Sequence, residues 1–304
     1  MYRANGKLLL TAEYAVLDGA QALAIPTRFG QRFKVKEQSR GYDLVWKALD
    51  DQGKTWYEGK FSLYDFSCIQ STDDKISKTL RKLLKACCQQ NSDFLSNWKG
   101  YQVVSNLEFP RAWGLGSSST LVYFMAEWAD INPYLLLFDS LGGSGYDVAC
   151  ASAEGPILYT LGEDSLAIDH LDHDLPAAPY LYFVYTGKKQ ETEEAVKQYR
   201  KQARKSGWLE QINTLTQAMA TVKDYKELNQ IVVDHERILG EQLAMTPVKE
   251  HEFSDYWGAI KSLGAWGGDF IMATSDRPVK ETEAYFNARG LDVIFPYDGI
   301  IYKG

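Results

Sequence analysis

The 304-residue sequence lacks the commonest signatures of nucleotide-binding folds. It contains no G-x-x-x-x-G-K-[ST] segment and no G-x-G-x-x-G fingerprint, so a P-loop or a Rossmann dinucleotide fold is disfavoured. It has no run of 18 uncharged apolar residues, and its first apolar stretch carries Glu13 in place of a signal-peptide layout. We therefore expect a cytoplasmic protein that has no membrane partner.

Cysteine and positive charge are also scarce. The four cysteines, Cys68, Cys87, Cys88 and Cys150, form no C-x-x-C pair, which favours buried free thiols over a disulfide or zinc framework. Lys and Arg total 33 against 40 Asp and Glu, giving a net charge of -7. Because such a surface repels polyanions, we expect no nucleic-acid partner, and an anionic ligand needs a local site.

Apolar patterning predicts a chain that mixes strands and helices. Short extended segments dominate the first quarter, and the apolar YAVL at residues 14–17 is taken as one of them. Asp73 or Asp74 is expected to cap one helix, and Asn132 followed by Pro133 another. The first quarter of the chain is therefore predicted to be mostly β, with helices following it.

The residue pattern changes near residues 176–179, where a polar loop is followed by the strand-like YLYFVYTG and then by long amphipathic helical stretches. A chain of this length can form two sizeable cores. We therefore predict two domains, residues 1–177 and residues 178–304.

The segment PRAWGLGSSST, residues 110–120, stands between a strand-like stretch and a helical apolar stripe. The first N–H groups of a helix are unpaired and the helix dipole is positive there, so phosphate oxygens fit such a position. Gly114 and Gly116 would let the backbone approach a ligand closely. Ser117 to Ser119 would equally make an ordinary N-cap, so on these residues alone both interpretations stay open.

Four segments in order resemble the motifs of the GHMP kinases, the family named for galactokinase, homoserine kinase, mevalonate kinase and phosphomevalonate kinase. The segments are GKLLLTAEYAVLDGAQALAIP (6–26), PRAWGLGSSS (110–119), GGSGYDVACA (142–151) and KSLGAWGGDFIMA (261–273). Together they span nearly the whole chain. We refer to the last of them as the third motif.

The resemblance implies an α+β fold with an N-terminal ribosomal-protein-S5-domain-2-like domain and a C-terminal ferredoxin-like domain. It implies an ATP- and Mg²⁺-dependent small-molecule kinase whose site lies in the cleft between those domains. The GSGYDVA and GGD segments, with TGKKQET at residues 186–192, resemble the phosphomevalonate kinase branch. Phosphomevalonate is the expected acceptor and mevalonate the alternative, within isoprenoid precursor synthesis.

The resemblance also assigns site residues. Asp147 matches the catalytic aspartate, which accepts the acceptor's proton, and Lys7 matches the lysine that orients it or stabilises developing charge. The nucleotide phosphates are assigned to Gly114, Leu115, Gly116, Ser117, Ser118 and Ser119, with Ser118 as a magnesium ligand. The acceptor is assigned to Ser144, Gly145, Lys188, Thr192, Gly264, Gly267 and Gly268.

Three departures from the family pattern stand out. Ala12 replaces a glycine, which matters if the backbone there needs a positive φ, and Trp266 replaces a glycine of the third motif, where it would crowd or cap a pocket. No glutamate precedes Asp147 at the family's metal position, so Asp139 or Glu127 is expected to replace it, or the serine hydroxyl and phosphates act alone. An inactive nucleotide-binding paralogue, a diphosphomevalonate decarboxylase-like enzyme and a homodimeric assembly stay open.

Overall fold

The computed structural model describes residues 1–304 except 40, 98, 164, 172–173, 189–191 and 267, and for residues 192–195 only the backbone. The chain forms two compact units. Unit 1 comprises Met1–Gly6, Phe29–Arg111 and Leu115–Ser152, and unit 2 comprises Lys7–Arg28, Ala112–Gly114 and Ala153–Gly304. The boundary at residues 177/178 stays a prediction.

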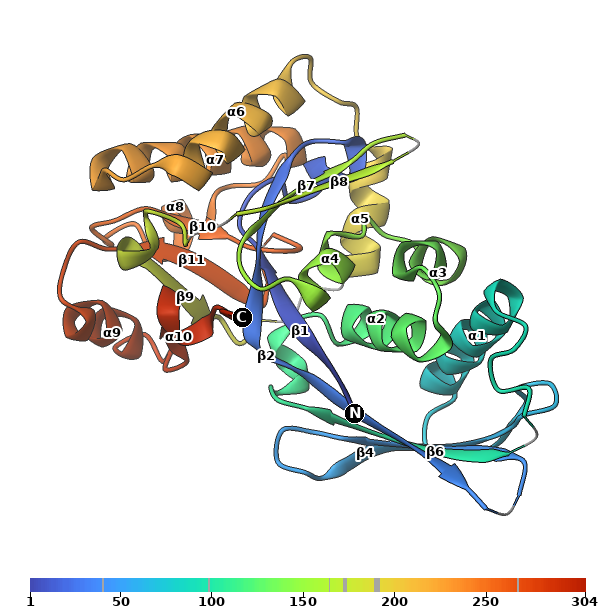
Figure 1. Ribbon diagram of the computed structural model, residues 1–304. Coiled ribbons are helices and arrows are strands. Elements are labelled where there is room, and N and C mark those ends of the chain that lie inside the picture. The colour runs from blue at the N-terminus through green and yellow to red at the C-terminus, as the bar shows by residue number, and fades with distance from the viewer. Residues whose placement is uncertain (40, 98, 164, 172–173, 189–191, 267) are drawn as a thin grey trace. The chain divides into compact units, whose positions relative to one another are not determined.

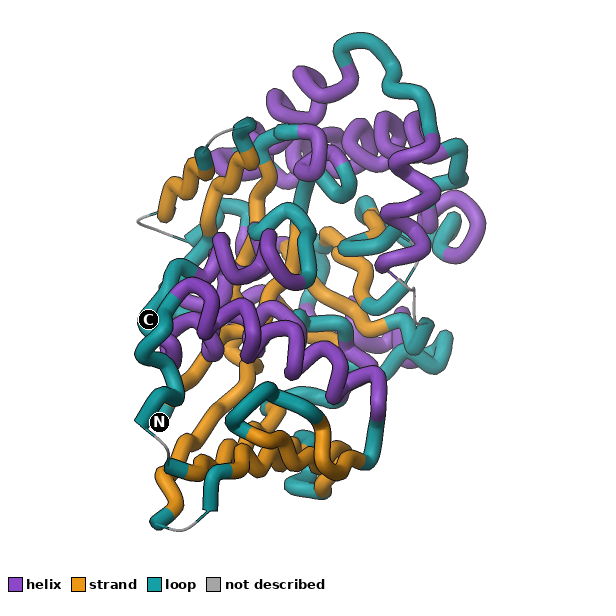
Figure 2. The backbone as a smooth tube through the Cα atoms, turned by 90° about the vertical axis from the view of Figure 1, so that its right-hand side faces the viewer, coloured by secondary structure: helices purple, strands orange, loops and turns teal. Residues whose placement is uncertain are grey.

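Both units combine helices with strands, which Figure 2 shows in separate colours. Two strands, β1 (Tyr2–Leu9) and β2 (Ala22–Gln38), contribute residues to each unit. The strands form two sheets, so the predicted α+β class is confirmed. No helix among the described residues is long and apolar enough to cross a bilayer.

Unit 1 is a sheet covered by helices. Its elements are β3 (Asp43–Leu49), β4 (Thr55–Ser62), β5 (Cys68–Ser71), α1 (Asp74–Gln90), β6 (Gly100–Leu107), α2 (Ser117–Ala129), α3 (Pro133–Ser140) and α4 (Tyr146–Ser152). The strand order is β5-β4-β3-β6-β2, with β3 and β6 parallel and the other pairs antiparallel. Helices α1, α2 and α3 lie on one face of these strands (Figure 1), and apolar residues from both layers form a single core.

The predicted helix starts of unit 1 are confirmed. Asp73 caps α1 by accepting hydrogen bonds from the backbone N–H groups of Lys75 and Ile76. Asn132 caps α3 in the same way, with Pro133 in its first turn. Short polar side chains at these positions satisfy amides that have no partner within the helix.

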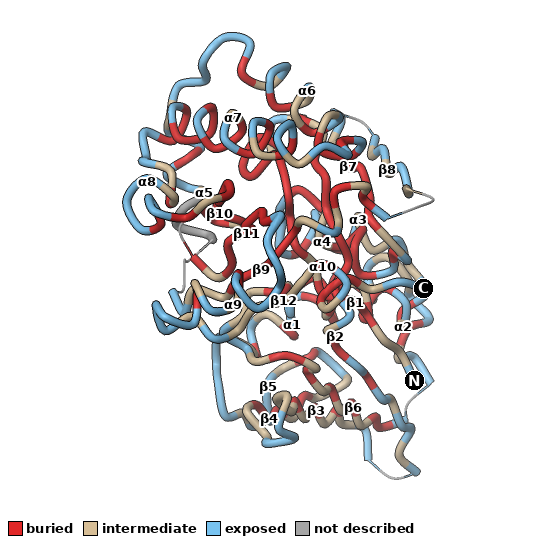
Figure 3. The backbone as a smooth tube through the Cα atoms, turned by 90° about the vertical axis from the view of Figure 1, so that its left-hand side faces the viewer, coloured by how far each residue is buried: buried red, intermediate tan, exposed pale blue. Residues whose placement is uncertain are grey.

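Unit 2 contains a second sheet with the order β10-β11-β9-β12, all pairs antiparallel. The strands of the second sheet are β9 (Leu181–Tyr185), β10 (Ile260–Ser262), β11 (Phe270–Thr274) and β12 (Ile294–Pro296). Two further strands of unit 2, β7 (Ile157–Leu161) and β8 (Leu166–His170), belong to the first sheet, where β7 pairs with Ala22–Ala24 of β2 and β8 pairs with β7. Its helices are α5 (Thr192–Lys201), α6 (Trp208–Thr221), α7 (Tyr225–Leu243), α8 (Val248–Glu252), α9 (Val279–Asn287) and α10 (Tyr297–Ile300). Strands β10 and β11 are buried along their whole length (Figure 3).

The described residues also form three short 3-10 helices: η1 (Ala15–Asp18), η2 (Arg111–Trp113) and η3 (Ala178–Tyr180). The first of them corrects the expectation of an extended YAVL segment. Ala12 and Tyr14 have φ values of 63° and 61°, in the left-handed region, and they turn the chain before it can extend. The hairpin of β7 and β8 is not among the predicted elements.

Candidate active site

The loop before α2 leaves the start of that helix without a side-chain cap. Gly116 is the N-cap residue, with φ 95° and ψ 40°, a left-handed conformation that glycine adopts without strain. Ser117 and Ser118 are exposed, and Ser119 Oγ instead donates a hydrogen bond to the Gly116 carbonyl at 2.8 Å. Among these described residues no serine therefore acts as the N-cap, and the first-turn amides are available to an anion.

Lys7 lies beside this loop within unit 2. Its Nζ donates to the carbonyl oxygen of Gly114 at 3.1 Å. Gly114 has φ 65°, and a Cβ placed there would stand 2.1 Å from Asp269 Oδ2. Gly114 is thus required for its backbone conformation and for its missing side chain. Asp269, which the sequence marks only through the GGD motif, is therefore a further candidate for the site.

Hydrogen bonds hold Asp269 next to the TGK segment. The Asp269 N–H donates to the Lys188 carbonyl at 2.6 Å, and the Thr186 N–H donates to the Asp269 carbonyl at 2.8 Å. The Lys188 side chain itself is exposed and forms an ion pair with Glu252 at 2.5 Å. The structure therefore brings together Lys7, Gly114 and the Lys188 backbone around Asp269.

Aromatic side chains of unit 2 fix the residues that precede Gly114. Trp113 packs edge-on against Phe270 and Phe295, with ring centroids 6.0 and 5.5 Å apart. The Tyr185 hydroxyl donates to the Ala112 carbonyl at 3.2 Å. The strands β9, β11 and β12 thus anchor the start of the glycine loop.

Asp147, the predicted catalytic aspartate, lies in unit 1 in the first turn of α4. Its Oδ1 accepts a hydrogen bond from the Val148 N–H at 3.0 Å. Gly145 precedes it with φ 93°, and Ser144 is buried. The role of Asp147 as the proton acceptor stays a prediction.

The remaining predicted acceptor residues belong to unit 2. Gly264 has φ 65° with open space where a Cβ would stand, and Gly268 is buried. Gly267 and the side chain of Thr192 lie outside the described part of the chain. Leu115, by contrast, is buried in unit 1 and packs as a core residue.

Neither carboxylate suggested as a metal ligand fits that role. Glu127 is nine residues after Ser118 on the same helix, which corresponds to about 14 Å along the axis. Asp139 accepts a hydrogen bond from Gln90 at 2.9 Å on the exposed surface of unit 1. The described residues contain no group of three or more His, Cys, Asp or Glu that could hold a metal. Ser118 stays the predicted protein ligand.

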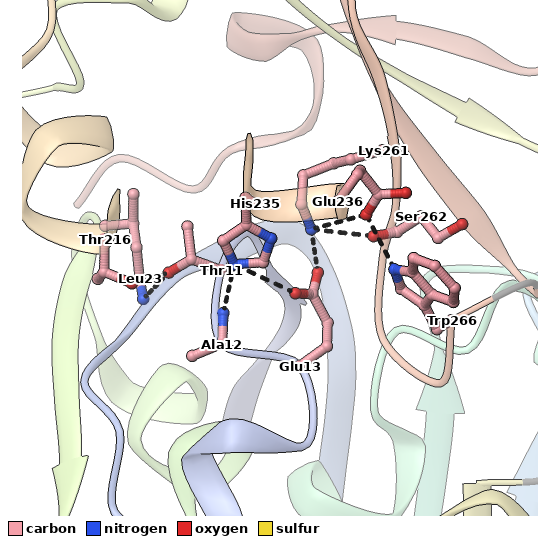
Figure 4. A network of polar contacts seen from close by, with 10 residues as sticks. All are labelled: Thr11, Ala12, Glu13, Leu23, Thr216, His235, Glu236, Lys261, Ser262 and Trp266. Carbon is pink, nitrogen blue, oxygen red and sulfur yellow. Dashed lines mark hydrogen bonds and ion pairs between the residues drawn. The ribbon is translucent and has the colours of Figure 1, made fainter. Parts of the chain in front are cut away.

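A buried polar network, which sequence reasoning missed, connects the first and third motifs inside unit 2 (Figure 4). The ammonium group of Lys261 forms a short contact with Glu13 Oε1, donates to the Ser262 carbonyl at 2.9 Å, and lies 4.0 Å from Glu236 Oε1. His235 Nε2 accepts the Ala12 N–H at 3.0 Å. The only sequence signal was Glu13 and Lys261 standing inside apolar stretches.

Trp266 belongs to this network and does not line an open pocket. Its indole is 2% exposed, and its Nε1–H donates to Glu236 Oε1 at 2.8 Å. Its φ of 47° is in the left-handed region, where glycine is favoured. The two glycine replacements, Ala12 and Trp266, therefore both occupy positions that need a positive φ.

A pocket of about 400 Å³ in unit 2 is lined by residues around the end of α7, among them Gly240, Met245 and Pro247. It contains none of the predicted site residues. The site assignments of Lys7 in unit 2 and of Asp147 in unit 1 therefore rest on the motifs.

No protein-family model matches the sequence, and no curated protein sequence does. Solved structures match over nearly the full chain. A mevalonate kinase matches with a TM-score of 0.67 at 14% identity, over 96% of each chain. Streptococcus pneumoniae phosphomevalonate kinase in complex with phosphomevalonate and AMPPNP matches with a TM-score of 0.68 at 16% identity, over 97% of this chain and 98% of that one.

Lactococcus lactis galactokinase complexed with galactose matches with a TM-score of 0.71 at 12% identity, over 99% of this chain and 93% of that one. Kinases for three different acceptors thus match about equally well. This protein has the fold that these members of the GHMP kinase family share, and the likeness does not single out one branch.

Proposed function

We propose that this protein is an ATP-dependent small-molecule kinase of the GHMP family that transfers the γ-phosphoryl group of ATP to phosphomevalonate. The observation that carries the proposal is the uncapped start of α2 behind Gly116, which leaves several backbone N–H groups for phosphate oxygens. The family fold and the four ordered motifs support it.

In this proposal, residues of the segments 6–26 and 110–119 act on the phosphate groups of the nucleotide. The amides of residues 116–119 and the exposed hydroxyls of Ser117 and Ser118 would bind the nucleotide phosphates. Lys7, whose Nζ is held on the Gly114 carbonyl, would supply a positive charge that stabilises the charge developing in the transfer. Mg²⁺, held by Ser118 and the phosphates, would neutralise phosphate charge when bound.

Asp147 would act on the acceptor. In the transfer, an acceptor oxygen forms a bond to the γ-phosphorus while the bond to the β–γ bridging oxygen breaks and ADP leaves. Mevalonate would attack through a hydroxyl, whose proton Asp147 would take. A phosphomonoester has a second pKa of about 6 and is mostly ionised at pH 7, so it needs less help from a base.

The test is ADP release by the purified full chain with Mg²⁺-ATP, with mevalonate, phosphomevalonate and galactose assayed in parallel. We expect turnover with phosphomevalonate, and identification of the product by mass distinguishes it from a decarboxylase, which would release carbon dioxide. Asp147→Asn should reduce turnover by about 10²–10⁴-fold with a hydroxyl acceptor and by less with phosphomevalonate. Asp169→Asn, on the exposed end of β8, is the matched control and should keep full activity.

ATP binding without turnover on any acceptor would refute the proposal in favour of an inactive paralogue. Turnover with mevalonate alone would move the acceptor assignment to the alternative. Equal turnover by Asp147→Asn and the wild type on mevalonate would refute the role of Asp147.

A further inference from the structure

The buried network holds more acidic groups than positive charge. Glu13, Glu236 and Lys261 are at most 2% exposed, so two carboxyl groups share one ammonium. His235 adds no charge, because its Nε2 accepts the Ala12 N–H and the proton of the ring must then stand on Nδ1. A second ionised carboxylate in this environment would be a buried charge without compensation.

The geometry indicates which carboxyl group keeps its proton. Glu13 is in direct contact with the Lys261 ammonium, whereas Glu236 is 4.0 Å from it and accepts instead from the Trp266 indole. Within the described part of the chain, Glu236 Oε2, Glu13 Oε2 and His235 Nδ1 have no hydrogen-bond partner. The carboxyl farther from the ammonium is the one that is best kept neutral.

Burial raises the pKa of both carboxyl groups, and for Glu13 the charge of Lys261 and the hydrogen bond from its ammonium oppose the rise. Burial raises the pKa of Glu236 to about 8, and the charge of Glu13 adds to the rise, while Lys261, the Trp266 indole and the Ser262 backbone oppose it. Burial lowers the pKa of His235 well below its usual value, with Lys261 acting in the same direction. Besides these groups, Tyr14 lies next to Glu13, and burial raises the pKa of its hydroxyl to about 12.

The loop of the third motif that follows Lys261 and Ser262 is attached to this network at two adjacent residues, Ala265 and Trp266. The Tyr14 hydroxyl donates to the Ala265 carbonyl at 2.8 Å, and the Trp266 indole donates to Glu236. Gly240, one turn after Glu236 on α7, leaves room for the indole, because a Cβ there would be 3.2 Å from Trp266 Cη2. The strained φ of Trp266 is therefore held by contacts that the rest of unit 2 supplies.

We propose that Glu236 and Trp266 form a proton-dependent anchor that positions the third-motif loop, Leu263–Trp266. When Glu236 is protonated the network is charge-balanced and the indole stays docked. When Glu236 ionises, an uncompensated charge is buried under the loop, and the loop loosens. Glu236 and Trp266 are positioning residues, and the anchor is a property of this chain because a tryptophan stands where the family pattern has glycine.

The test is amide hydrogen exchange of Leu263–Trp266 between pH 6.5 and 9.5, corrected for the intrinsic pH dependence of exchange. We expect the corrected exchange rate of the wild type to rise about tenfold from pH 7 to pH 9, as Glu236 ionises. Glu236→Gln keeps the shape and stays neutral, so its corrected rate should stay constant. Glu241→Gln changes an exposed carboxylate on the same helix and should behave like the wild type.

A second variant keeps the proposal testable if Glu236→Gln does not fold. Trp266→Phe removes the indole donor, which helps to stabilise ionised Glu236, so the midpoint of the pH-dependent rise should move to higher pH. A purely structural indole would loosen the loop at every pH and leave the midpoint unchanged. An unchanged midpoint, a constant wild-type rate, or the same rise in Glu236→Gln would overturn the proposal.

The exchange measurement does not require kinase activity, so it separates the anchor from the proposed function. Only the effect on turnover rests on that function: the third motif is assigned to the acceptor, so kcat/KM should fall above pH 8 in the wild type and not in Glu236→Gln. Loop exchange that follows the prediction in a protein without turnover would refute the kinase assignment and leave the anchor standing.

Discussion

The two glycine-rich segments, residues 110–120 and the third motif, meet the same backbone demand in opposite ways. Before α2, the left-handed positions are occupied by Gly114 and Gly116. In the third motif Gly264 takes one such position, with φ 65°, but Trp266 and Asp269 take two others, with φ values of 47° and 39°. The first segment leaves backbone amides open for a ligand, whereas the second fills its interior with a side chain. In the loop before α2, glycine leaves space for a ligand, whereas in the third motif the buried side chain of Trp266 occupies a glycine position.

Removal of the anchor should have the largest effect on stability. Trp266→Gly relieves about 1–2 kcal/mol of backbone strain but deletes a buried aromatic side chain, which costs about 3–5 kcal/mol. The net expectation is a loss of about 1–4 kcal/mol in the free energy of unfolding, measured by urea denaturation. Ala12→Gly relieves similar strain without a large cavity and should be neutral or slightly stabilising. A Trp266→Gly variant more stable than the wild type would show that strain outweighs the indole's packing.

A side chain at Gly114, in the loop before α2, should have a somewhat smaller effect on stability and a clear effect on ATP binding. Gly114→Ala introduces strain of about 1–3 kcal/mol and a clash with the Asp269 carboxylate, so ATP affinity should fall at least about tenfold. Gly290→Ala, at φ 75° with open space around it, is the matched control for strain alone. Calorimetric titration of ATP measures both variants. Adding Asp269→Gly to Gly114→Ala should recover the part of the stability that the clash costs, and no recovery at all would rule out the clash.

Two titratable groups of the buried network, His235 and Glu236, should make the protein respond to pH in opposite directions. Ionisation of Glu236 loosens the loop at high pH, whereas protonation of His235 lowers the free energy of unfolding at low pH. Neutral His235 has a pKa well below 6.5, while the unfolded chain protonates near 6.5, so its contribution is complete above that pH and is lost on acidification. At pH 5.5 the loss is about 1.4 kcal/mol. Urea unfolding at pH 7.0 and 5.5 should show this difference between the wild type and His235→Gln. The exposed His251→Gln is the control, and an identical pH dependence in all three proteins would mean that His235 is not held neutral.

The smallest effect concerns the contrast between capped α1 and uncapped α2. Asp73→Ala removes two hydrogen bonds to helix amides and should cost about 1 kcal/mol, with no change in ATP affinity. Thermal unfolding with and without ATP measures both quantities. If Asp73→Ala weakened ATP binding as much as Gly114→Ala does, the uncapped start of α2 would not be the specific phosphate site.

The sequence predicted what depends on neighbouring residues. The predicted caps at Asp73 and Asn132 are confirmed, because a capping hydrogen bond spans only two or three positions. The replacement of a glycine by Ala12 raised the question of a positive φ at residue 12, and the backbone there does have a positive φ. The fold class followed from the ordered motifs and is confirmed. The assignments of Asp147, Lys7 and the serines stay predictions.

What could not be predicted depends on residues that are far apart in the chain. Glu13 and Lys261 pair across 248 positions, and nothing local to either residue shows that they are buried together. The apolar YAVL segment was predicted to be extended. It forms a 3-10 helix because Ala12 and Tyr14, just before that helix, adopt positive φ values. Glu236 lies among other charged residues of α7, so its burial was hidden by its neighbours in sequence.

The membership of residues 7–28 in unit 2 has a consequence for how the chain is made. These residues leave the ribosome early, yet Lys261, the partner of Glu13, follows 248 positions later. At about 5–20 residues per second, roughly 12–50 s of synthesis separate the two. During that interval Glu13 has no ion-pair partner, although Ala22–Ala24 can pair with β7 once residues 157–159 have been made, and most of unit 1 is already complete. The nascent segment of residues 7–28 is therefore where we expect molecular chaperones to bind.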